Sequence, residues 1–238
     1  MVNFSDYLAF YKAARKRARS NQDYVEFEKF QAKIVSDFLN KKRIMLKGKK
    51  ALDIGCGRGG YTRMLLEAGA KVTALDITKD YFMPHKGIKF VRGDALSMPF
   101  KDNGFDFVFC SSLIEHVADP NKLVNEIKRV MKPHGICYLS FPPFWSPVGS
   151  HQFKPFHYLG EWAAVRISRV LYGTKSQKYD DEYGKLKKRT IMQVKRIIRR
   201  NGLRIRSIST RMSPVNFAKI PLLNEFLTWH AEFILEKP

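Results

Sequence analysis

The stretch from Ala51 to Tyr61, which reads ALDIGCGRGGY, constrains the fold of this 238-residue chain more than any other. Its first four residues are apolar except for one acid, and glycines at positions 55, 57, 59 and 60 end that run abruptly. This pattern predicts a buried strand that stops in a tight turn. Met64, Leu65 and Ala68 follow at helical spacing, so we expect a helix whose N-terminal amides face a ligand. A strand, a glycine loop and a helix in this order indicate a site for a nucleotide-type cofactor.

Three acids decide which cofactor the loop suits. The glycines also satisfy the G-x-G-x-x-G spacing of dinucleotide-binding proteins. However, Asp53 places a carboxylate at the mouth of the strand, where it would repel a pyrophosphate and attract a cationic aminoacyl group. Asp76 ends the next apolar run about 20 residues later, a position suited to the ribose hydroxyls. Asp94 follows a third apolar run. The residues therefore favour S-adenosylmethionine over a dinucleotide.

The motifs also resemble those of a known family. D-x-G-C-G-x-G begins at Asp53, a strand ends in Asp76, and G-D-A-x-x-x-P-F begins at Gly93. Together they resemble class I S-adenosylmethionine-dependent methyltransferases over roughly residues 50–142. The resemblance implies that the glycine loop wraps the methionine part, that the second acid binds the ribose and that the third contacts the adenine amino group. The cofactor-binding residues predicted on this basis are Asp53, Gly55, Cys56, Gly57, Asp76, Ile77, Asp94, Ala95 and Ser111.

The rest of the chain continues an α/β pattern. Apolar runs at 105–110 and 135–141 predict a fourth and a fifth strand, and helical patterns separate the strands. Two more strands are predicted at 203–209 and 229–235, and the family pattern places the last one antiparallel between its predecessor and the fifth. We therefore expect a doubly wound, mostly parallel seven-stranded sheet with the Rossmann-like methyltransferase fold.

We expect a single methyltransferase domain over residues 1–238. Its predicted parts are N-terminal helices in 1–46, a cofactor-binding core in 47–141, a lid and substrate-selecting insertion in 142–189, and a C-terminal helix with strands in 190–238. The N-terminal helices are expected at 3–20 and 23–40, and the insertion is expected to contain a helix at 161–172. A stripe of Phe27, Phe30, Ile34 and Phe38 is predicted to face inward from the second helix.

The charge of the chain is +21 and is unevenly spread. Residues 154–211 alone carry 16 Lys and Arg against 4 acids, whereas residues 51–153 are nearly neutral. A basic surface attracts nucleic acid, anionic membranes or phosphorylated substrates, although solvated helix faces explain it equally well. No apolar run reaches the about 20 residues that cross a bilayer, so we expect a soluble, cytoplasmic protein. The three cysteines are expected to be reduced core residues.

Three histidines are candidates for catalysis. His116 follows the fourth strand, and in open α/β sheets ligands bind at the carboxyl ends of strands. It resembles the histidine of the family's E-H-V motif and could act as a base, but we favour a role in orienting its loop. His151 and His157 lie in the predicted lid, where acid-base chemistry or phosphate binding is expected. They are six residues apart without a third ligand at metal spacing, so no metal is expected.

The preferred function is methyl transfer from S-adenosylmethionine to a small acceptor, with oxygen as the favoured target atom. The basic insertion suggests an acceptor that is anionic, bears phosphate, or is linked to a lipid or sugar, with membrane association as one possibility. An RNA or protein methyltransferase that uses the basic flanks is a second interpretation, and nucleic acid is therefore a less favoured partner. A cofactor-binding protein without catalysis is a third. The sequence leaves the oligomeric state open.

Overall fold

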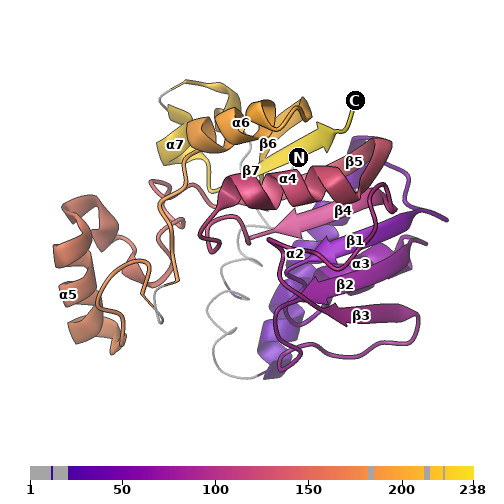
Figure 1. Cartoon of the computed structure of the whole chain (residues 1–238). Coiled ribbons are helices and arrows are strands. Elements are labelled where there is room, and N and C mark those ends of the chain that lie inside the picture. Colours follow the sequence, from indigo (N-terminus) through magenta and orange to yellow (C-terminus); the bar gives the residue numbers. More distant parts are fainter. Residues whose placement is uncertain (1–11, 13–20, 182–184, 212–214, 222) are drawn as a thin grey trace. The chain divides into compact units, whose positions relative to one another are not determined.

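A computed structural model describes residues 12, 21–181, 185–211, 215–221 and 223–238 (Figure 1). Of the first predicted helix, 3–20, all but Lys12 lies outside these residues. The described strands are β1 (Lys50–Ile54), β2 (Lys71–Asp76), β3 (Ile88–Arg92), β4 (Phe105–Ser111), β5 (Met131–Phe141), β6 (Arg204–Arg211) and β7 (His230–Glu236). The α-helices are α2 (Asn21–Lys41), α3 (Gly60–Glu67), α4 (Pro120–Val130), α5 (Glu161–Tyr172), α6 (Ile191–Arg200) and α7 (Leu223–Leu227).

The strands form one seven-stranded sheet in the order β3-β2-β1-β4-β5-β7-β6. Strand β1 pairs in parallel with β2 and β4, and β2 pairs in parallel with β3, so these strands lie side by side in Figure 1. Strands β6 and β7 pair antiparallel. The predicted doubly wound, mostly parallel sheet is therefore confirmed, including an antiparallel last strand between the fifth and the sixth.

The sequence analysis did not predict the shortest helices. The structure contains three 3-10 helices, η1 (His151–Phe153), η2 (Phe156–Leu159) and η3 (Phe217–Lys219), and the five-residue helix α7. Segments of three to five residues do not complete enough turns for a helical period to show in the sequence. By contrast, α5 begins and ends at the predicted residues because its pattern runs over three turns.

Helix α2 buries a different face from the predicted one. Apart from Phe27, the buried residues among the side chains of α2 that the structure describes are Ala32, Val35 and Leu39, whereas Phe30, Ile34 and Phe38 are only half-buried. The buried set advances by three or four residues, so it forms its own helical stripe next to the aromatic one. Helix α2 packs against α3, and small or branched side chains such as Ala32 and Val35 permit a close approach.

The described residues divide into two compact units, each with its own packing. The first comprises the chain up to Cys110 together with residues 126–137 and 237, and the second comprises 111–125, 138–236 and 238. In the first unit, the parallel strands β1, β2 and β3 end at the same edge of the sheet. This edge carries the glycine loop, Asp76 and Asp94. The predicted division into four parts of one domain stays a prediction.

In the second unit, the segment after β5 has a hydrophobic core of its own. Its buried residues come from the connection after β5, from η1, from α5 and from the chain that leads to α6: Phe144, Phe153, Ala164, Val165, Tyr179 and Leu186. Trp145 and Phe156 pack against this cluster. The predicted lid therefore contains a packed aromatic core in this structure.

Candidate active site

The glycine loop has the backbone geometry of a ligand cradle. Gly55 and Gly57 have φ values of 71° and 52°, in the left-handed region where a side chain would be strained. A Cβ atom at Gly57 would meet nothing within 4 Å, so the space beside this residue is open. The Gly57 amide donates to Asp76 Oδ2 at 2.9 Å, which ties the loop to the end of β2. The loop thus presents backbone to open space next to the predicted ribose acid.

Asp53 lies beneath the loop and is only 2% exposed. Its Oδ2 atom accepts a hydrogen bond of 2.5 Å from Thr62 Oγ1 on α3. Burial raises the pKa of Asp53 to about 7; the Thr62 bond opposes this shift, and the nearby carboxylates of Glu28 and Asp76 add to it. A buried acid in such surroundings favours a cationic ligand, since a positive charge would stabilise its ionised form.

Glu28, on α2, is a site residue that the sequence analysis missed. Burial raises its pKa to about 7, while the Arg58 guanidinium and a hydrogen bond from the Gly60 amide oppose the shift. A Cβ atom at Gly60 would lie 2.7 Å from Glu28 Oε2, so the absence of a side chain at Gly60 lets the acid approach. The only hint in the sequence was Gly60. Its place in the glycine motif did not by itself explain why a side chain is excluded at this position.

The predicted adenosine-binding residues lie along the ends of β2 and β3. Asp76 Oδ1 accepts a hydrogen bond of 3.3 Å from the Thr78 amide. Ile77 follows with an exposed fraction of 66%, an apolar surface beside the predicted ribose acid. Asp94 Oδ1 accepts from the Leu96 amide at 2.8 Å. Ala95 is half-buried next to it. Since β2 and β3 are paired in parallel, these residues share one edge of the sheet.

Cys56 has a different environment from the rest of the predicted set. Its side chain is buried in a cluster with Ala74 and Phe82, and burial raises the pKa of its thiol. Its amide donates to the Leu75 carbonyl oxygen at 3.1 Å. In this conformation only the backbone of Cys56 is available to contact a cofactor. Its side chain is the small core residue that was expected.

The first unit fits S-adenosylmethionine on these observations. Three carboxylates lie near the loop, and those of Glu28 and Asp76 are close enough to Asp53 to raise its pKa. The methionyl ammonium and the sulfonium are positive, so they suit this group of acids, whereas a pyrophosphate does not. Asp76 and the exposed Ile77 would supply an acceptor for the ribose and an apolar surface for the base. When bound, this cofactor supplies an electrophilic methyl group.

Ser111, the last residue predicted to bind the cofactor, is buried in the second unit. Its hydroxyl shares a hydrogen bond of 2.9 Å with the Ser140 hydroxyl. Ser140 also accepts from Arg211 at 3.2 Å and lies 3.2 Å from His230 Nε2. The structure therefore places Ser111 at the edge of a buried polar network, and its contact with the cofactor stays a prediction.

The centre of that network is a buried ion pair that the sequence analysis missed. Arg211 Nε donates to Glu232 Oε1 at 3.2 Å, and both side chains are no more than 3% exposed. The Tyr138 hydroxyl donates to the same Glu232 atom at 2.6 Å and accepts from Arg211 at 2.7 Å. Arg211 lies beyond the predicted strand 203–209, and a lone sequence cannot show that Glu232 of β7 lies beside it.

Glu115 and His116 lie on the loop that follows β4. Glu115 is 1% exposed, and burial raises its pKa to about 8. His116 is exposed, and its Nδ1 is hydrogen-bonded to the Lys185 carbonyl oxygen. Although the residue as a whole is exposed, partial desolvation of its ring lowers the pKa of His116. The hydrogen bond to the Lys185 carbonyl supports the favoured interpretation that His116 orients its surroundings, and its catalytic role stays a prediction.

The two lid histidines differ in their environments. His151, on η1, is half-buried, and its ring centroid lies 5.0 Å from that of His116. His157, on η2, is fully buried between the rings of Phe144, Trp145 and Tyr158, and burial lowers its pKa. The structure therefore groups His151 with His116. An acceptor cannot reach His157 in this conformation, and its predicted catalytic role stays untested.

Comparisons with known proteins agree with the fold and the cofactor motifs. Residues 52–139 match the family described as the methyltransferase domain. An uncharacterized methyltransferase of Mycobacteroides abscessus is 31% identical over 132 residues, which cover 52% of this chain and 51% of that protein. A sterol 24-C-methyltransferase of Gibberella zeae is 41% identical over 101 residues, which cover 37% of this chain and 26% of that enzyme. The chain therefore spans about half the length of its mycobacterial relative.

A solved structure extends the similarity in fold to most of the chain. The S-adenosylmethionine-dependent methyltransferase of Mesorhizobium loti superposes with a TM-score of 0.59 at 19% identity, covering 84% of this chain and 96% of that one. At this identity the likeness concerns the fold alone. It agrees with the match of residues 52–139 to the methyltransferase domain family, which the glycine loop and the ordered acids also resemble.

Proposed function

We propose that the protein transfers a methyl group from S-adenosylmethionine to an oxygen of a small, lipid-linked acceptor at an anionic lipid surface. The observation that carries this proposal is the solvent-facing side of α5 and η2. Trp162 and Val170 on α5 are 77% and 79% exposed, and Leu171 and Tyr172 at its end are also exposed. Leu159 on η2 extends this surface. We call these side chains, together with Arg166 and Arg169, the α5 face.

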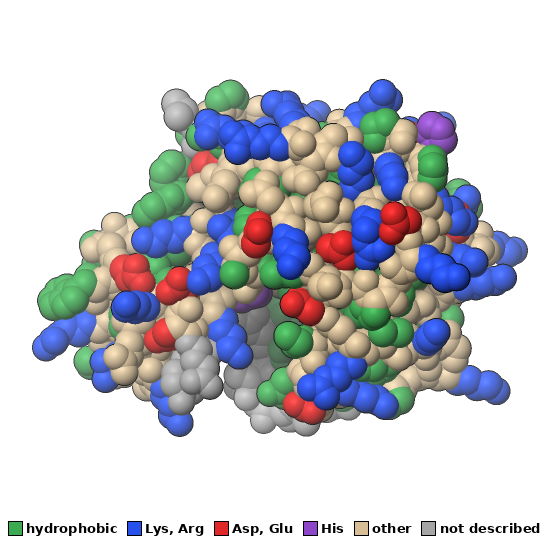
Figure 2. All heavy atoms as spheres, viewed as in Figure 1, with side chains coloured by type: hydrophobic (Ala, Val, Ile, Leu, Met, Phe, Trp, Pro, Cys, Tyr) green, Lys and Arg blue, Asp and Glu red, His purple; other side chains and the backbone are tan. Residues whose placement is uncertain are grey.

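The α5 face combines apolar and positive groups. The Arg166 guanidinium lies 5.7 Å from the Trp162 ring centroid, and Arg169 is exposed on the same side of the helix. Figure 2 shows hydrophobic and basic side chains next to each other over α5, the helix labelled in Figure 1. The opposite side of α5, with Ala164, Val165 and Ser168, is buried. Large exposed apolar groups with arginines are typical of helices that lie in the headgroup region of anionic membranes.

Within the residues that the structure describes, no helix is long and apolar enough to cross a membrane. The proposed attachment is therefore peripheral, and the positive charge of residues 154–211 would strengthen it. An RNA substrate would be held mainly by lysines and arginines along the phosphates, and exposed Trp162, Val170 and Leu171 would contribute little to that contact. These apolar side chains favour lipid over RNA as the surface that is recognised.

The reaction requires alignment, exclusion of water and removal of a proton. Methyl transfer from a sulfonium is an in-line displacement, so positioning of the two reactants supplies much of the rate enhancement. We propose that Glu28 and Asp53 hold the positive end of the cofactor and that Asp76 fixes its ribose. An acceptor hydroxyl must also lose its proton, which the His116 imidazole could accept if the acceptor reached it.

The test is transfer of labelled methyl groups from S-adenosylmethionine into vesicles made with the total lipids of the source cells. The expected result is label in the lipid fraction, which alkali releases if the methyl is on an ester and retains if it is on an ether. Trp162→Ser/Val170→Ser should lose vesicle binding and lipid labelling, while its cofactor affinity stays unchanged. Met45→Ser is the matched control because Met45 is 72% exposed on the first unit. Label in RNA or protein, or equal activity of both variants, would overturn the proposal.

A further inference from the structure

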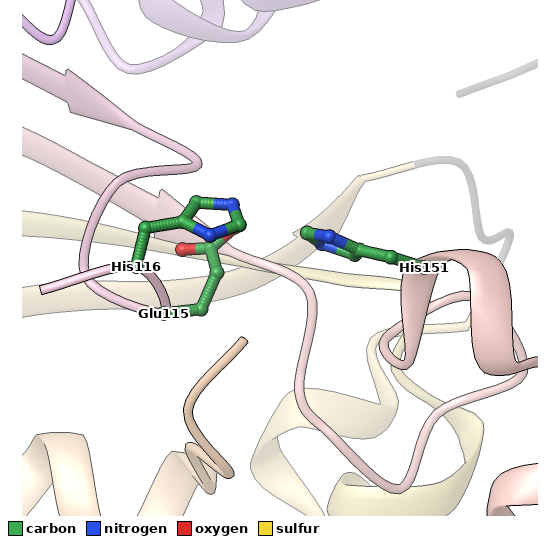
Figure 3. A group of neighbouring side chains, drawn as sticks. All are labelled: Glu115, His116 and His151. Atoms are coloured by element: carbon green, nitrogen blue, oxygen red, sulfur yellow. The ribbon is translucent and has the colours of Figure 1, made fainter. Parts of the chain in front are cut away.

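We propose that Glu115, His116 and His151 bind a divalent transition-metal ion and leave part of its coordination sphere open. Each residue offers one ligand atom, and these three atoms all lie within 4.8 Å of one another. Figure 3 shows the Glu115 carboxylate and the His116 ring on one loop, pointing toward the His151 ring on η1. All three residues belong to the second unit. The sequence analysis expected no metal because it paired His151 with His157.

The Glu115 carboxylate is the strongest sign of a missing ligand. The side chain is 1% exposed, and within the described part of the chain neither of its oxygens has a hydrogen-bond partner. A buried carboxyl without a hydrogen-bond partner is costly, since the charge of Arg189 replaces its lost hydration only in part. A metal ion would supply the missing partner directly.

His116 already has the hydrogen bond of a metal ligand. Its Nδ1 donates to the Lys185 carbonyl oxygen, which leaves the lone pair on Nε2. Metal-bound histidines almost always donate their other ring N–H to a carbonyl or carboxylate in this way, because the bond fixes both the tautomer and the orientation of the ring. The exposed His116 thus presents an acceptor nitrogen in a fixed direction.

The loop that carries two of the ligands is anchored by backbone contacts. The Arg189 guanidinium donates to the carbonyl oxygens of Ile114 and Val117, and the Lys187 amide donates to the Glu115 carbonyl oxygen. The segment from Lys185 to Arg189 therefore holds the loop from one side and also orients His116. Such supporting contacts are typical of sites whose ligands must keep their position.

The chemical nature of the three ligands and the charges near them limit which ion can bind. Arg189 acts electrostatically on Glu115, and His230 lies close enough to His151 to interact with it. Two imidazoles and one carboxylate suit Zn²⁺, Fe²⁺ or Mn²⁺ and leave positions for water or a substrate oxygen. Tetrahedral ligand atoms lie about 3.4 Å apart at metal distances of about 2.1 Å, so the histidine side chains must move closer by rotation.

A bound ion would give the second unit a chemical role. It would hold an acceptor oxygen in an open position and lower the pKa of a hydroxyl there, which would replace the base role considered for His116, since its Nε2 would then be a ligand. This consequence rests on the proposed function, whereas metal binding does not. The test therefore measures binding of the metal alone, so that its failure is distinguishable from failure of the lipid assay.

The experiment is calorimetry of the full chain, without a histidine tag and after treatment with a chelator, titrated with Zn²⁺. We expect one saturable site per chain. Glu115→Gln, His116→Ala and His151→Asn should each weaken it by at least about 10-fold, the loss that even an outer partner of a metal ligand causes. Asparagine is chosen for position 151 because His151 has a φ of 52°, which asparagine tolerates.

Two controls separate this site from chance binding to the six histidines of the chain. His85→Ala removes a histidine of the first unit and should leave the affinity unchanged. Co²⁺ should give visible absorption bands in the wild type that His116→Ala abolishes, with far-ultraviolet circular dichroism confirming that the variant is folded. Absence of saturable binding at millimolar metal, or equal binding by His116→Ala and His85→Ala, would overturn the proposal.

Discussion

Two regions of the molecule bury acids in opposite ways. In the second unit, Glu232 has its own cation and donor: Arg211 and the Tyr138 hydroxyl both reach the same carboxylate oxygen. In the first unit, Asp53 and Glu28 lie near each other beside the glycine loop, and burial raises the pKa of each to about 7. Glu232 is neutralised within the protein, whereas the carboxylate of Glu28 raises the pKa of Asp53 further.

The difference separates structural acids from acids that receive a ligand. A buried charge that is paired and hydrogen-bonded holds strands together, and removing its partner leaves an uncompensated charge. When the ionised forms of neighbouring buried acids destabilise one another, a positively charged ligand relieves the repulsion, so its binding is favoured. The first arrangement links Tyr138 of β5, Arg211 of β6 and Glu232 of β7, and we infer that the second prepares the glycine loop for a sulfonium cofactor.

The largest expected effect is on the paired acid. Arg211→Met should lower the free energy of unfolding by about 3–5 kcal/mol, because Glu232 would remain buried without its cation. Urea denaturation followed by circular dichroism measures this change. The double variant Arg211→Met/Glu232→Gln should recover part of the loss, since the unpaired charge is gone. A single variant as stable as the wild type would show that the pair is not structural.

The next effect concerns the ribose acid. Asp76→Ala should weaken binding of S-adenosylmethionine by about 1–3 kcal/mol, because the ribose hydroxyls lose a charged acceptor and the Gly57 amide loses its partner. Calorimetry at neutral pH gives the affinity. Asp80→Ala is the control, since Asp80 is exposed on the connection after β2. Equal losses in both variants would mean that general charge, not the ribose contact, governs binding.

A smaller effect is the pH dependence of cofactor affinity. Asp53 and Glu28 bind protons below pH 7 in the protein without ligand, and a cationic ligand favours their ionised forms. Affinity should therefore rise with pH and level off above about 7, by up to about 1.4 kcal/mol per pH unit for each proton released. Calorimetry in buffers of different ionisation enthalpy counts the protons. Asp53→Asn should flatten the curve, and a curve that falls toward high pH would contradict the assignment.

The same pKa values predict how stability changes with pH. Asp53 and Glu28 are raised from 3.8 and 4.5 to about 7, so the folded protein binds more protons than the unfolded one between these values. Their contribution to the stability of the ligand-free protein is present below the unfolded pKa and is lost as pH rises toward 7. Thermal unfolding at several pH values should show that added cofactor stabilises the protein more at pH 8 than at pH 5.

The sequence predicted the first unit well because its signals are local. The glycine loop follows β1, Asp76 ends β2 and Asp94 comes two residues after β3, so a short window shows each strand together with its candidate site residue. Glu28 lies outside such a window, because it reaches Gly60 from a helix more than thirty residues upstream. No pattern in the sequence of α2 predicts that contact, because it depends on the tertiary fold.

The second unit was predicted less well because its contacts are distant in sequence. Arg211 meets Tyr138 across 73 residues, and His116 meets the Lys185 carbonyl across 69. Spacing along the chain suggested that His151 and His157 belong together, but the aromatic core encloses His157 and leaves His151 beside His116. Periodicity gave α5 its bounds, yet it could not show which polar residues share a site.

The smallest expected effect concerns Glu115, which belongs to neither group in the comparison. It is buried like Glu232 but its oxygens have no hydrogen-bond partner among the described residues. In buffer with a chelator, Glu115→Gln should change the free energy of unfolding by less than about 1 kcal/mol, because the substitution keeps the shape and breaks no hydrogen bond. Urea denaturation beside Arg211→Met gives the direct contrast. A loss of several kcal/mol would instead make Glu115 the structural counterion of Arg189, and the loop after β4 would then resemble the Glu232 network.

With Zn²⁺ added, the wild type should gain stability and Glu115→Gln should gain much less, since a ligand that binds only the folded state stabilises it by mass action.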